Sequence, residues 1–272
     1  MGRVLVGDRL SEPESAYDAA AARFDWHRAL PDGVAEAIRS AILNAMSMLS
    51  PPRLLDLGAG TGRIGHAFVT TGDDYIGADL SLGMLREFAK RGRANAPRLV
   101  QADGARLPFA DASFDAVMMM QVLGAAWRSR SLVDEALRVL RAPGTLVFGH
   151  SVMPRDGLDA KMKKQLASLL AEMGASPYHT DARSEVIGWL GCVATSSTRV
   201  VAAEWDTTRT PAGFLKRQPT GAQFAQLPQW VRDEALAKLG AWAAATFGSL
   251  DAELQERHLF ELSVFKFQQG RC

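Results

Sequence analysis

Cysteine is scarce in this chain, which holds only two among 272 residues. Neither Cys192 nor Cys272 has the partners of a zinc site, so we expect a reduced, cytoplasmic protein. Long apolar runs are missing as well: none reaches the length of a membrane span, and no N-terminal signal sequence is visible. We find no internal repeat, and the length suits one domain with an elaboration.

An excess of charge of one sign is also missing. The chain has 31 lysines and arginines against 30 aspartates and glutamates, which gives a formal net charge of +1. Because acids and bases are interspersed, the chain has neither the basic footprint of a nucleic-acid-binding protein nor a polybasic membrane patch. We therefore expect a small-molecule partner, no nucleic acid and no membrane, in a monomer or a homodimer.

The most informative feature that is present lies in residues 54–65. An apolar stretch ends near Asp56, and Gly58, Gly60 and Gly62 follow at alternate positions before a helix-like pattern begins. Glycines there let the backbone turn tightly and approach a ligand that a Cβ atom would keep away. The helix N-terminus behind them offers free N–H groups to an anionic part of that ligand.

A second apolar run ends in Asp79. A carboxylate at the end of the neighbouring strand can accept two hydrogen bonds from a ribose diol, so the two runs predict a cofactor that contains adenosine. Two enzyme families use this layout. Gly60, Gly62 and Gly65 satisfy the G-x-G-x-x-G pattern of dinucleotide-dependent dehydrogenases. The same loop also fits the acid-x-G-x-G-x-G motif of S-adenosylmethionine-dependent methyltransferases.

Later motifs favour the second family. A short apolar run ends near Asp103, Phe114-Asp115 opens another, and Arg138-Val139-Leu140 precedes Pro143-Gly144 and a further strand-like run. This ordered series resembles the class I S-adenosylmethionine-dependent methyltransferases of the small-molecule type over residues 54–149. A dehydrogenase would need a second catalytic segment and does not predict the patterns at Asp103 and Arg138.

The resemblance implies the fold. We expect an α/β domain with a Rossmann-like, seven-stranded, mostly parallel sheet, an antiparallel last strand and helices on both faces. Ligands of such a sheet bind beyond the carboxyl ends of its strands. The strands that we expect lie at residues 53–57, 74–79, 97–101, 115–120, 144–150, 195–203 and 258–267.

We expect three parts in the chain. Residues 1–50 are predicted to form an N-terminal helical cover over the cofactor, with an amphipathic helix over residues 34–49. Residues 51–272 are predicted to form the methyltransferase domain. Within it, residues 206–255 are expected to be a helical insertion on the substrate side, before the last strand. Substrate specificity should then lie in the cover and the insertion.

The resemblance also assigns the cofactor, S-adenosyl-L-methionine, with S-adenosyl-L-homocysteine as its product. Asp56 should order the glycine loop, Asp79 should hold the ribose diol, and Asp103 should accept a hydrogen bond from the adenine amine. Leu80 and Met84 should lie against the adenine. Further cofactor contacts are expected from the glycine loop, two strand ends and the cover, at Gly58, Ala59, Gly60, Gly62, Ala102, Gly104, Gln121, Val122, Tyr17 and Arg23.

The reaction asks little of the protein, because a methyl group on a sulfonium is already electrophilic. Positioning the acceptor alone can supply roughly 7–11 kcal/mol. We expect transfer to an oxygen, nitrogen or carbon atom of a small molecule, with His150 as the candidate general base and Trp127 and Arg209 in the acceptor pocket. No metal is expected, because Gln121 stands where magnesium-dependent relatives carry an aspartate and the chain has no Asp-Asn pair.

Two other readings stay open on the sequence. One is a methyltransferase-like protein that binds the cofactor without transferase activity and acts as a partner or regulator. The other is a nicotinamide-dependent oxidoreductase. Binding of NADH against S-adenosylmethionine would separate the second from the methyltransferase reading.

Overall fold

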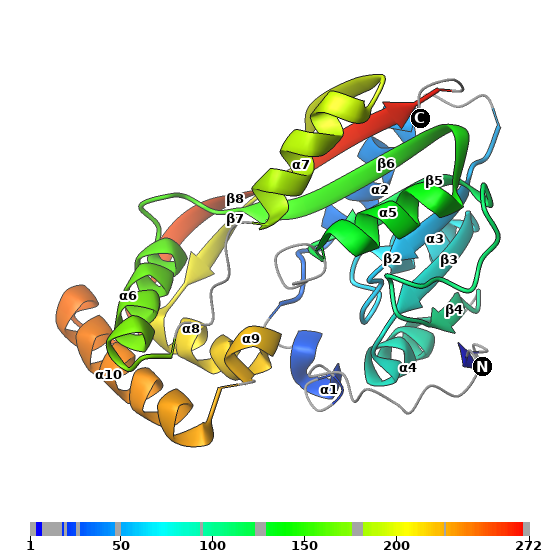
Figure 1. Cartoon of the computed structure of the whole chain (residues 1–272). Coiled ribbons are helices and arrows are strands. Elements are labelled where there is room, and N and C mark those ends of the chain that lie inside the picture. The colour runs from blue at the N-terminus through cyan, green and yellow to red at the C-terminus, as the bar shows by residue number, and fades with distance from the viewer. Residues whose placement is uncertain are drawn as a thin grey trace.

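The computed structural model describes residues 4–6, 18, 21–25, 28–46, 50–92, 95–122, 129–175, 182–225 and 227–268. Its core is an eight-stranded sheet with the strand order β1-β4-β3-β2-β5-β6-β8-β7 (Figure 1). The strands are β1 (Val4–Val6), β2 (Arg53–Leu57), β3 (Asp74–Asp79), β4 (Arg98–Gln101), β5 (Phe114–Met120), β6 (Leu140–Val152), β7 (Ser196–Arg209) and β8 (Leu254–Phe267).

The sheet is parallel except at one strand. β8 runs antiparallel to both of its neighbours, β6 and β7, and the other described pairs are parallel. This confirms the Rossmann-like sheet with an antiparallel last strand. β1 adds an eighth strand beside β4, where Val4 pairs with Leu99. This strand was not predicted, because three residues are too few to show an alternating pattern.

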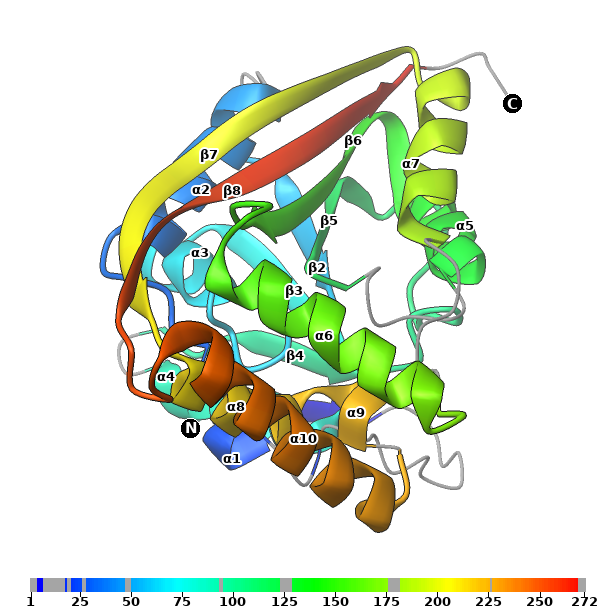
Figure 2. The ribbon, with the colours of Figure 1, turned by 90° about the vertical axis from the view of Figure 1, so that its left-hand side faces the viewer.

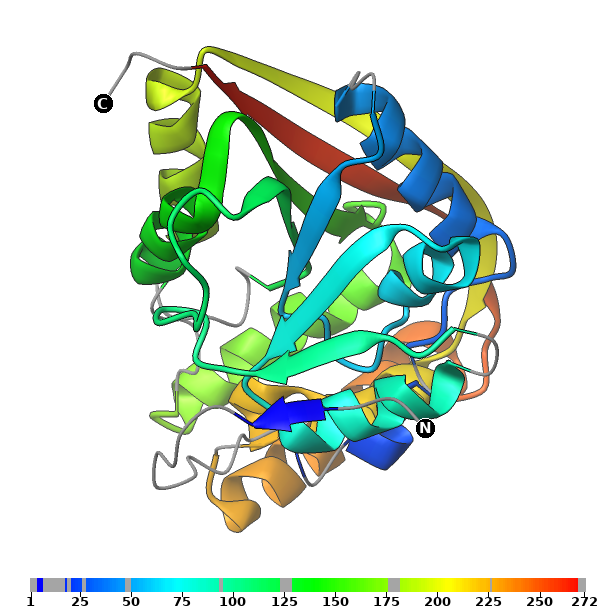
Figure 3. The same ribbon diagram turned by 90° about the vertical axis from the view of Figure 1, so that its right-hand side faces the viewer.

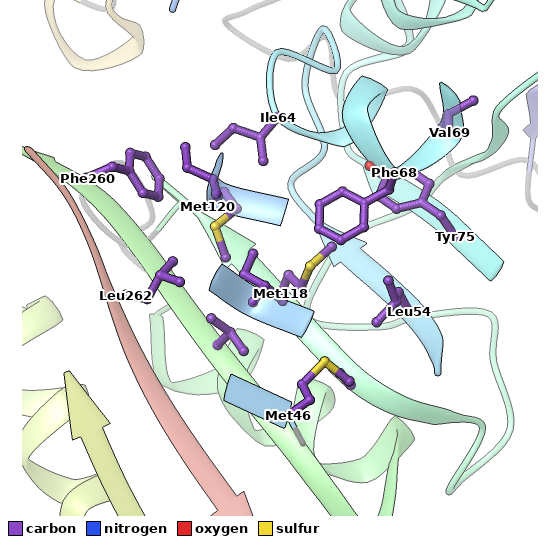
Figure 4. Packing of buried hydrophobic residues seen from close by; sticks show 14 of the residues in the cluster. Met46, Leu54, Ile64, Phe68, Val69, Tyr75, Met118, Met120, Phe260 and Leu262 are labelled. Carbon is purple, nitrogen blue, oxygen red and sulfur yellow. The ribbon is translucent and has the colours of Figure 1, made fainter. Parts of the chain in front are cut away.

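Helices cover both faces of the sheet, as Figure 3 shows. On one face lie α2 (Val34–Met46), α3 (Gly65–Thr71) and α4 (Leu82–Arg91). On the other face lie α5 (Ser129–Val139) and α7 (Ala182–Val193). The three consecutive methionines of β5 are all buried, and Figure 4 shows Met118 and Met120 among residues of α2, α3 and β8. These helix layers leave the carboxyl edge of the parallel strands for a ligand.

The expected N-terminal cover is divided into two parts. α2 is a layer of the core, since Ile38 and Ile42 are fully buried against the sheet and α3. The apolar stripe of α2 is buried against the sheet and α3, which explains why α2 does not lie across the cofactor edge. The segment that approaches this edge is shorter and includes Asp18 and α1 (Ala21–Phe24).

A second helical group stands beyond the sheet and has its own apolar core. It consists of α6 (Leu158–Glu172), α8 (Pro211–Arg217), α9 (Ala222–Ala225) and α10 (Gln229–Phe247), with the short 3-10 helix η3 (Gln218–Thr220) (Figures 1 and 2). β7 and β8 stay paired as far as Arg209 and Leu254, so the helical part begins a few residues after the predicted position of 206. The Thr210 hydroxyl caps α8 by accepting a bond from the Gly213 N–H (3.0 Å).

Candidate cofactor and acceptor site

The carboxyl ends of the four central parallel strands meet at one edge of the sheet. β2 leads there into the glycine loop, β3 ends at Asp79, β4 leads to Asp103 and β5 leads to Gln121. Neighbouring parallel strands that end in register place these residues beside each other, as the sequence predicted. Figure 2 shows α6 passing in front of this edge.

The glycine loop combines packing with open space. Gly58, Gly60 and Gly62 have φ of +83°, +56° and +77°, which L side chains rarely adopt. A Cβ atom at Gly58 would clash with Val122, and one at Gly62 would clash with the Phe88 ring. A Cβ atom at Gly60 would meet only the Gly58 carbonyl oxygen, at 4.0 Å. Gly60 is therefore the glycine that faces free space.

Asp79 fastens the glycine loop to the end of β3. Its Oδ2 accepts a hydrogen bond from the Gly60 N–H (2.8 Å), and its Oδ1 accepts one from the Ser81 N–H (2.8 Å). Burial raises the pKa of Asp79, and the nearby Asp18 adds to this, while the two N–H donors act against it. The Asp79 carboxylate thus holds the glycine loop in place and lies beside its opening.

Asp56 is a buried acid with one unsatisfied oxygen. Its residue is 1% exposed, and its Oδ2 accepts a bond from the Tyr75 hydroxyl (2.7 Å). Its Oδ1 has no partner among the described residues. Burial raises the pKa of Asp56 to about 7, against the lowering effect of the Tyr75 bond. A bound cation would satisfy this oxygen and its charge.

The segment before α2 binds the same loops through two acids. Asp18 Oδ1 accepts bonds from the Ser81 hydroxyl (2.6 Å) and the Gly83 N–H (2.8 Å). Asp25 accepts one from the Thr61 hydroxyl (2.7 Å). Neither acid was predicted from the sequence, which pointed to Tyr17 and Arg23 in this segment instead. Tyr17 lies outside the described residues; Arg23 lies in α1, and its side chain is likewise outside them.

At the end of β4, Ala102 and Asp103 form hydrogen bonds with the backbone. The Ala102 N–H donates to the Asp79 carbonyl (3.0 Å), and Asp103 Oδ1 accepts from the Ala105 N–H (2.9 Å). Leu80 is 39% exposed beside Asp79, which suits contact with a flat ring, whereas Met84 is buried with 3% exposure. Gly104 is a packing glycine, since a Cβ atom there would lie 2.7 Å from Leu132. Ala59 is half-buried in the loop.

Gln121 connects β5 to two residues that the sequence analysis did not single out. Its amide Nε2 donates to the Ser151 hydroxyl (2.7 Å), and its Oε1 accepts from the Arg63 guanidinium. Arg63 also donates to the Arg28 carbonyl, and burial lowers the pKa of Arg63 to about 10. Gln121 has φ of +61°, a strained value for a non-glycine residue that is held by its N–H bond to Gly149 (2.7 Å).

The three residues that we expected near the acceptor lie in different places. His150 on β6 faces Glu261 of β8, with 3.9 Å between His150 Nε2 and Glu261 Oε2. Arg209 ends β7, and its Nη2 lies 3.5 Å from His258 Nδ1. Trp127 lies outside the described residues. In the part of the chain that the structure describes, no three histidine, cysteine or acidic side chains gather as metal ligands, and no helix is long and apolar enough to span a membrane.

Comparison with known proteins agrees with the motif order. Residues 55–148 match the family model described as a methyltransferase domain. The chain is 36% identical over 182 residues to the demethylmenaquinone methyltransferase of Clavibacter sepedonicus, covering 64% of this chain and 71% of the relative. It is 31% identical over 183 residues to the demethylmenaquinone methyltransferase of Paenarthrobacter aurescens, covering 65% and 72%.

Solved structures share the fold. The YcgJ protein of Bacillus subtilis has a TM-score of 0.57 at 20% identity, covering 86% of this chain and 99% of that one. Phosphoethanolamine N-methyltransferase 2 of Haemonchus contortus, in complex with phosphomonomethylethanolamine and S-adenosylhomocysteine, has a TM-score of 0.52 at 17% identity and covers 93% and 58%. At these identities the likeness concerns the fold.

Proposed function

Because the chain belongs to the class I S-adenosylmethionine-dependent methyltransferases, we propose that it moves a methyl group from S-adenosylmethionine to an oxygen, nitrogen or carbon atom of a small molecule, without a metal. The observation that carries this proposal is the buried Asp56 oxygen, which has no partner in the described part of the chain, next to a glycine loop that is open at Gly60. A charged ammonium fits that oxygen, and a backbone without a Cβ atom fits a closely bound ligand.

Each strand end has a role in this proposal. Asp56 receives the ammonium, while Asp79 binds the ribose diol with the oxygen lone pairs that its two N–H bonds leave. Asp103 accepts from the adenine amine, and exposed Leu80 covers the ring. Arg63 and Gln121 lie at the β5 end, where their donors suit the carboxylate of the methionyl part.

When bound, S-adenosylmethionine supplies an electrophilic methyl group on its sulfonium. The chain's contribution is then position and exclusion of water. Gln121 is fixed at both ends of its amide by Arg63 and Ser151, so this part of the site is organised before an acceptor arrives. His150 is the candidate base if the acceptor must lose a proton, and Glu261 beside it would stabilise its charged form.

The acceptor is proposed to bind between the sheet edge and the group of α6, α8, α9 and α10. The relatives' name gives demethylmenaquinone as the first acceptor to test. The test incubates the protein with methyl-deuterated S-adenosylmethionine and each acceptor and measures S-adenosylhomocysteine and labelled product by mass spectrometry. Labelled product with the wild type and none with Gly60→Val is the expected result.

Cofactor binding without transfer to any acceptor would contradict catalysis and favour the inactive, cofactor-binding alternative. Failure of S-adenosylmethionine to bind at all would contradict both. Product formed equally well by the Gly60→Val variant would mean that the cofactor lies elsewhere.

A further inference from the structure

The corner where α6 and α8 meet the ends of β7 and β8 holds a buried group of charges. Each of its two carboxylates already has a hydrogen-bonded partner. Asp159 is paired with Arg217. Glu256 accepts from His258 Nε2 (2.9 Å) at one oxygen and from the Leu158 N–H at the other. Each acid thus already has a hydrogen-bonded partner, and Asp159 and Glu256 act on the other cations of the corner only through space.

Two cations of the corner have no such partner. Arg209 Nε is buried without a hydrogen bond to any described residue, and Arg209 forms no ion pair within the described chain. Burial lowers the pKa of Arg209, and the neighbouring Arg217 adds to this. A buried guanidinium N–H without an acceptor costs free energy, so the site favours an external acceptor.

Lys163 is the second cation, one helical turn after Asp159 on α6. Its side chain is exposed and has no ion pair with the residues that the structure covers. Although the residue as a whole is exposed, nearby protein atoms remove part of the hydration of its amine and lower the pKa of Lys163; Arg217 and Arg28 lower it further, against the raising effect of Asp159. Lys163 thus lies near both the corner and the N-terminal segment.

Arg28 connects this corner to the cofactor edge. Its Nη2 lies 3.7 Å from the position of a Cβ atom on Gly221, beside η3 and α9. Its carbonyl accepts the bond from Arg63, which in turn holds Gln121. Cations are therefore found both in the helical group and beside the place where the acceptor is proposed to meet the methyl group.

We propose that Lys163 and Arg209 bind an oxyanion of the methyl acceptor, a carboxylate or a phosphate, beside the Asp159–Arg217 pair. This inference rests on the proposed function and names the class of its substrate. Arg209 offers the buried N–H that a carboxylate or phosphate oxygen accepts, and Lys163 adds a mobile ammonium. A neutral acceptor, such as the quinone in the relatives' name, would leave both cations without a hydrogen-bonded counter-ion, so turnover of that quinone would contradict this inference and leave the proposed function standing. Trp205, whose ring lies 5.9 Å from that of His258, supplies an apolar wall for the acceptor body.

The test uses the full chain saturated with S-adenosylhomocysteine and titrated calorimetrically with benzoate, phenyl phosphate and benzamide, the neutral isostere of benzoate. We expect one anion to bind at least about tenfold more tightly than benzamide, which is a difference of about 1.4 kcal/mol. Lys163→Gln should weaken that anion about tenfold and leave the affinity for S-adenosylhomocysteine unchanged. Lys161→Gln removes the same charge two residues away on α6 and should change neither affinity.

Preference for benzoate identifies a carboxylate acceptor, and preference for phenyl phosphate identifies a phosphate. Equal affinities for benzoate, phenyl phosphate and benzamide, or equal effects of Lys163→Gln and Lys161→Gln, would overturn the proposal. Arg209→Lys keeps the charge but removes the Nε donor, so it should weaken the anion while the melting temperature checks that the corner still folds. Failure of S-adenosylhomocysteine itself to bind would instead reject the proposed function.

Discussion

Asp56 shows how far surroundings change one residue's chemistry. Between about pH 4 and pH 7, Asp56 keeps its proton in the folded chain, where its pKa is about 7. In the unfolded chain, where the ordinary pKa is 3.8, it loses that proton. A raised acid pKa favours folding below the ordinary value, and this contribution is lost as pH rises from about 4 to about 7. A cation bound beside Oδ1 would lower the pKa of Asp56, because it stabilises the ionised carboxylate.

Cofactor affinity should therefore depend on pH. Between pH 5.5 and 7 the affinity for S-adenosylmethionine should increase with pH, because binding requires Asp56 to lose its proton, and it should level off above pH 7. Asp56→Asn keeps an acceptor for Tyr75 and should flatten this profile. Calorimetry across buffers of different ionisation enthalpy measures the released proton. A wild-type profile as flat as that of the variant would reject the ammonium assignment.

Asp79 gives a second prediction at this scale. Asp79→Ala should weaken S-adenosylmethionine binding by roughly 1–3 kcal/mol, because the ribose hydroxyls and the Gly60 N–H lose their acceptor. Asp74→Ala is the matched control, since Asp74 begins the same strand and forms exposed ion pairs with Arg98 and Arg53. Calorimetry should separate the two variants, and equal affinities would remove Asp79 from the site.

The acids at the strand ends were predictable because each follows an apolar run directly. Arg63, Tyr75 and Asp18 were not, because their partners lie far away along the chain: Arg63 with Gln121, Tyr75 with Asp56, and Asp18 with Ser81. The arginine that follows the glycine loop could have been found from its place in the motif. Nothing in the sequence marks the other two.

At the scale of elements, the glycine loop separates binding from folding. Gly60→Val should abolish cofactor binding and leave a folded protein that is destabilised by about 1–2 kcal/mol, because its left-handed φ is unfavourable but its space is empty. Gly62→Val should unfold or strongly destabilise the chain, because the new side chain meets the buried Phe88 ring. Thermal melting and calorimetry measure both. Tight cofactor binding by Gly60→Val would show that the loop faces elsewhere.

A substitution in α2 tests whether this helix belongs to the core or covers the cofactor. Ile42 is 0% exposed under the sheet, so Ile42→Ala should lower the free energy of unfolding by about 2–5 kcal/mol with little effect on cofactor affinity. Ser40→Ala changes an exposed position of the same helix and should be nearly neutral. Denaturant unfolding gives the comparison. Lost cofactor affinity at unchanged stability would place α2 over the cofactor after all.

Most elements could be predicted because their apolar period and their turn residues agree, as at Thr210-Pro211 before α8. The role of α2 could not, since an amphipathic stripe says that one face is buried but not against which layer. β7 is longer than predicted because its later half pairs with β8 on a polar, exposed stretch that has no apolar signal, as at Glu204 and Asp206.

At the scale of the whole molecule, the near-zero net charge hides an uneven distribution. Lys163 on α6 and Arg209 at the end of β7 have no ion pair among the described residues, whereas many surface charges elsewhere do pair, as in Arg257 with Glu204. The composition led us to expect a small-molecule partner, but only the fold brings Lys163 and Arg209 toward the same Asp159–Arg217 pair. Because of this local excess of positive charge, the charge of the acceptor can be inferred from the structure.

The most direct test of the account is isothermal titration of the purified protein with S-adenosylmethionine, S-adenosylhomocysteine and NADH. We predict micromolar binding of the first two, and no binding of NADH, because the Asp56 oxygen and the open Gly60 loop suit the ammonium and sulfonium ligand. Binding of NADH alone, or of none of the three, would contradict the account.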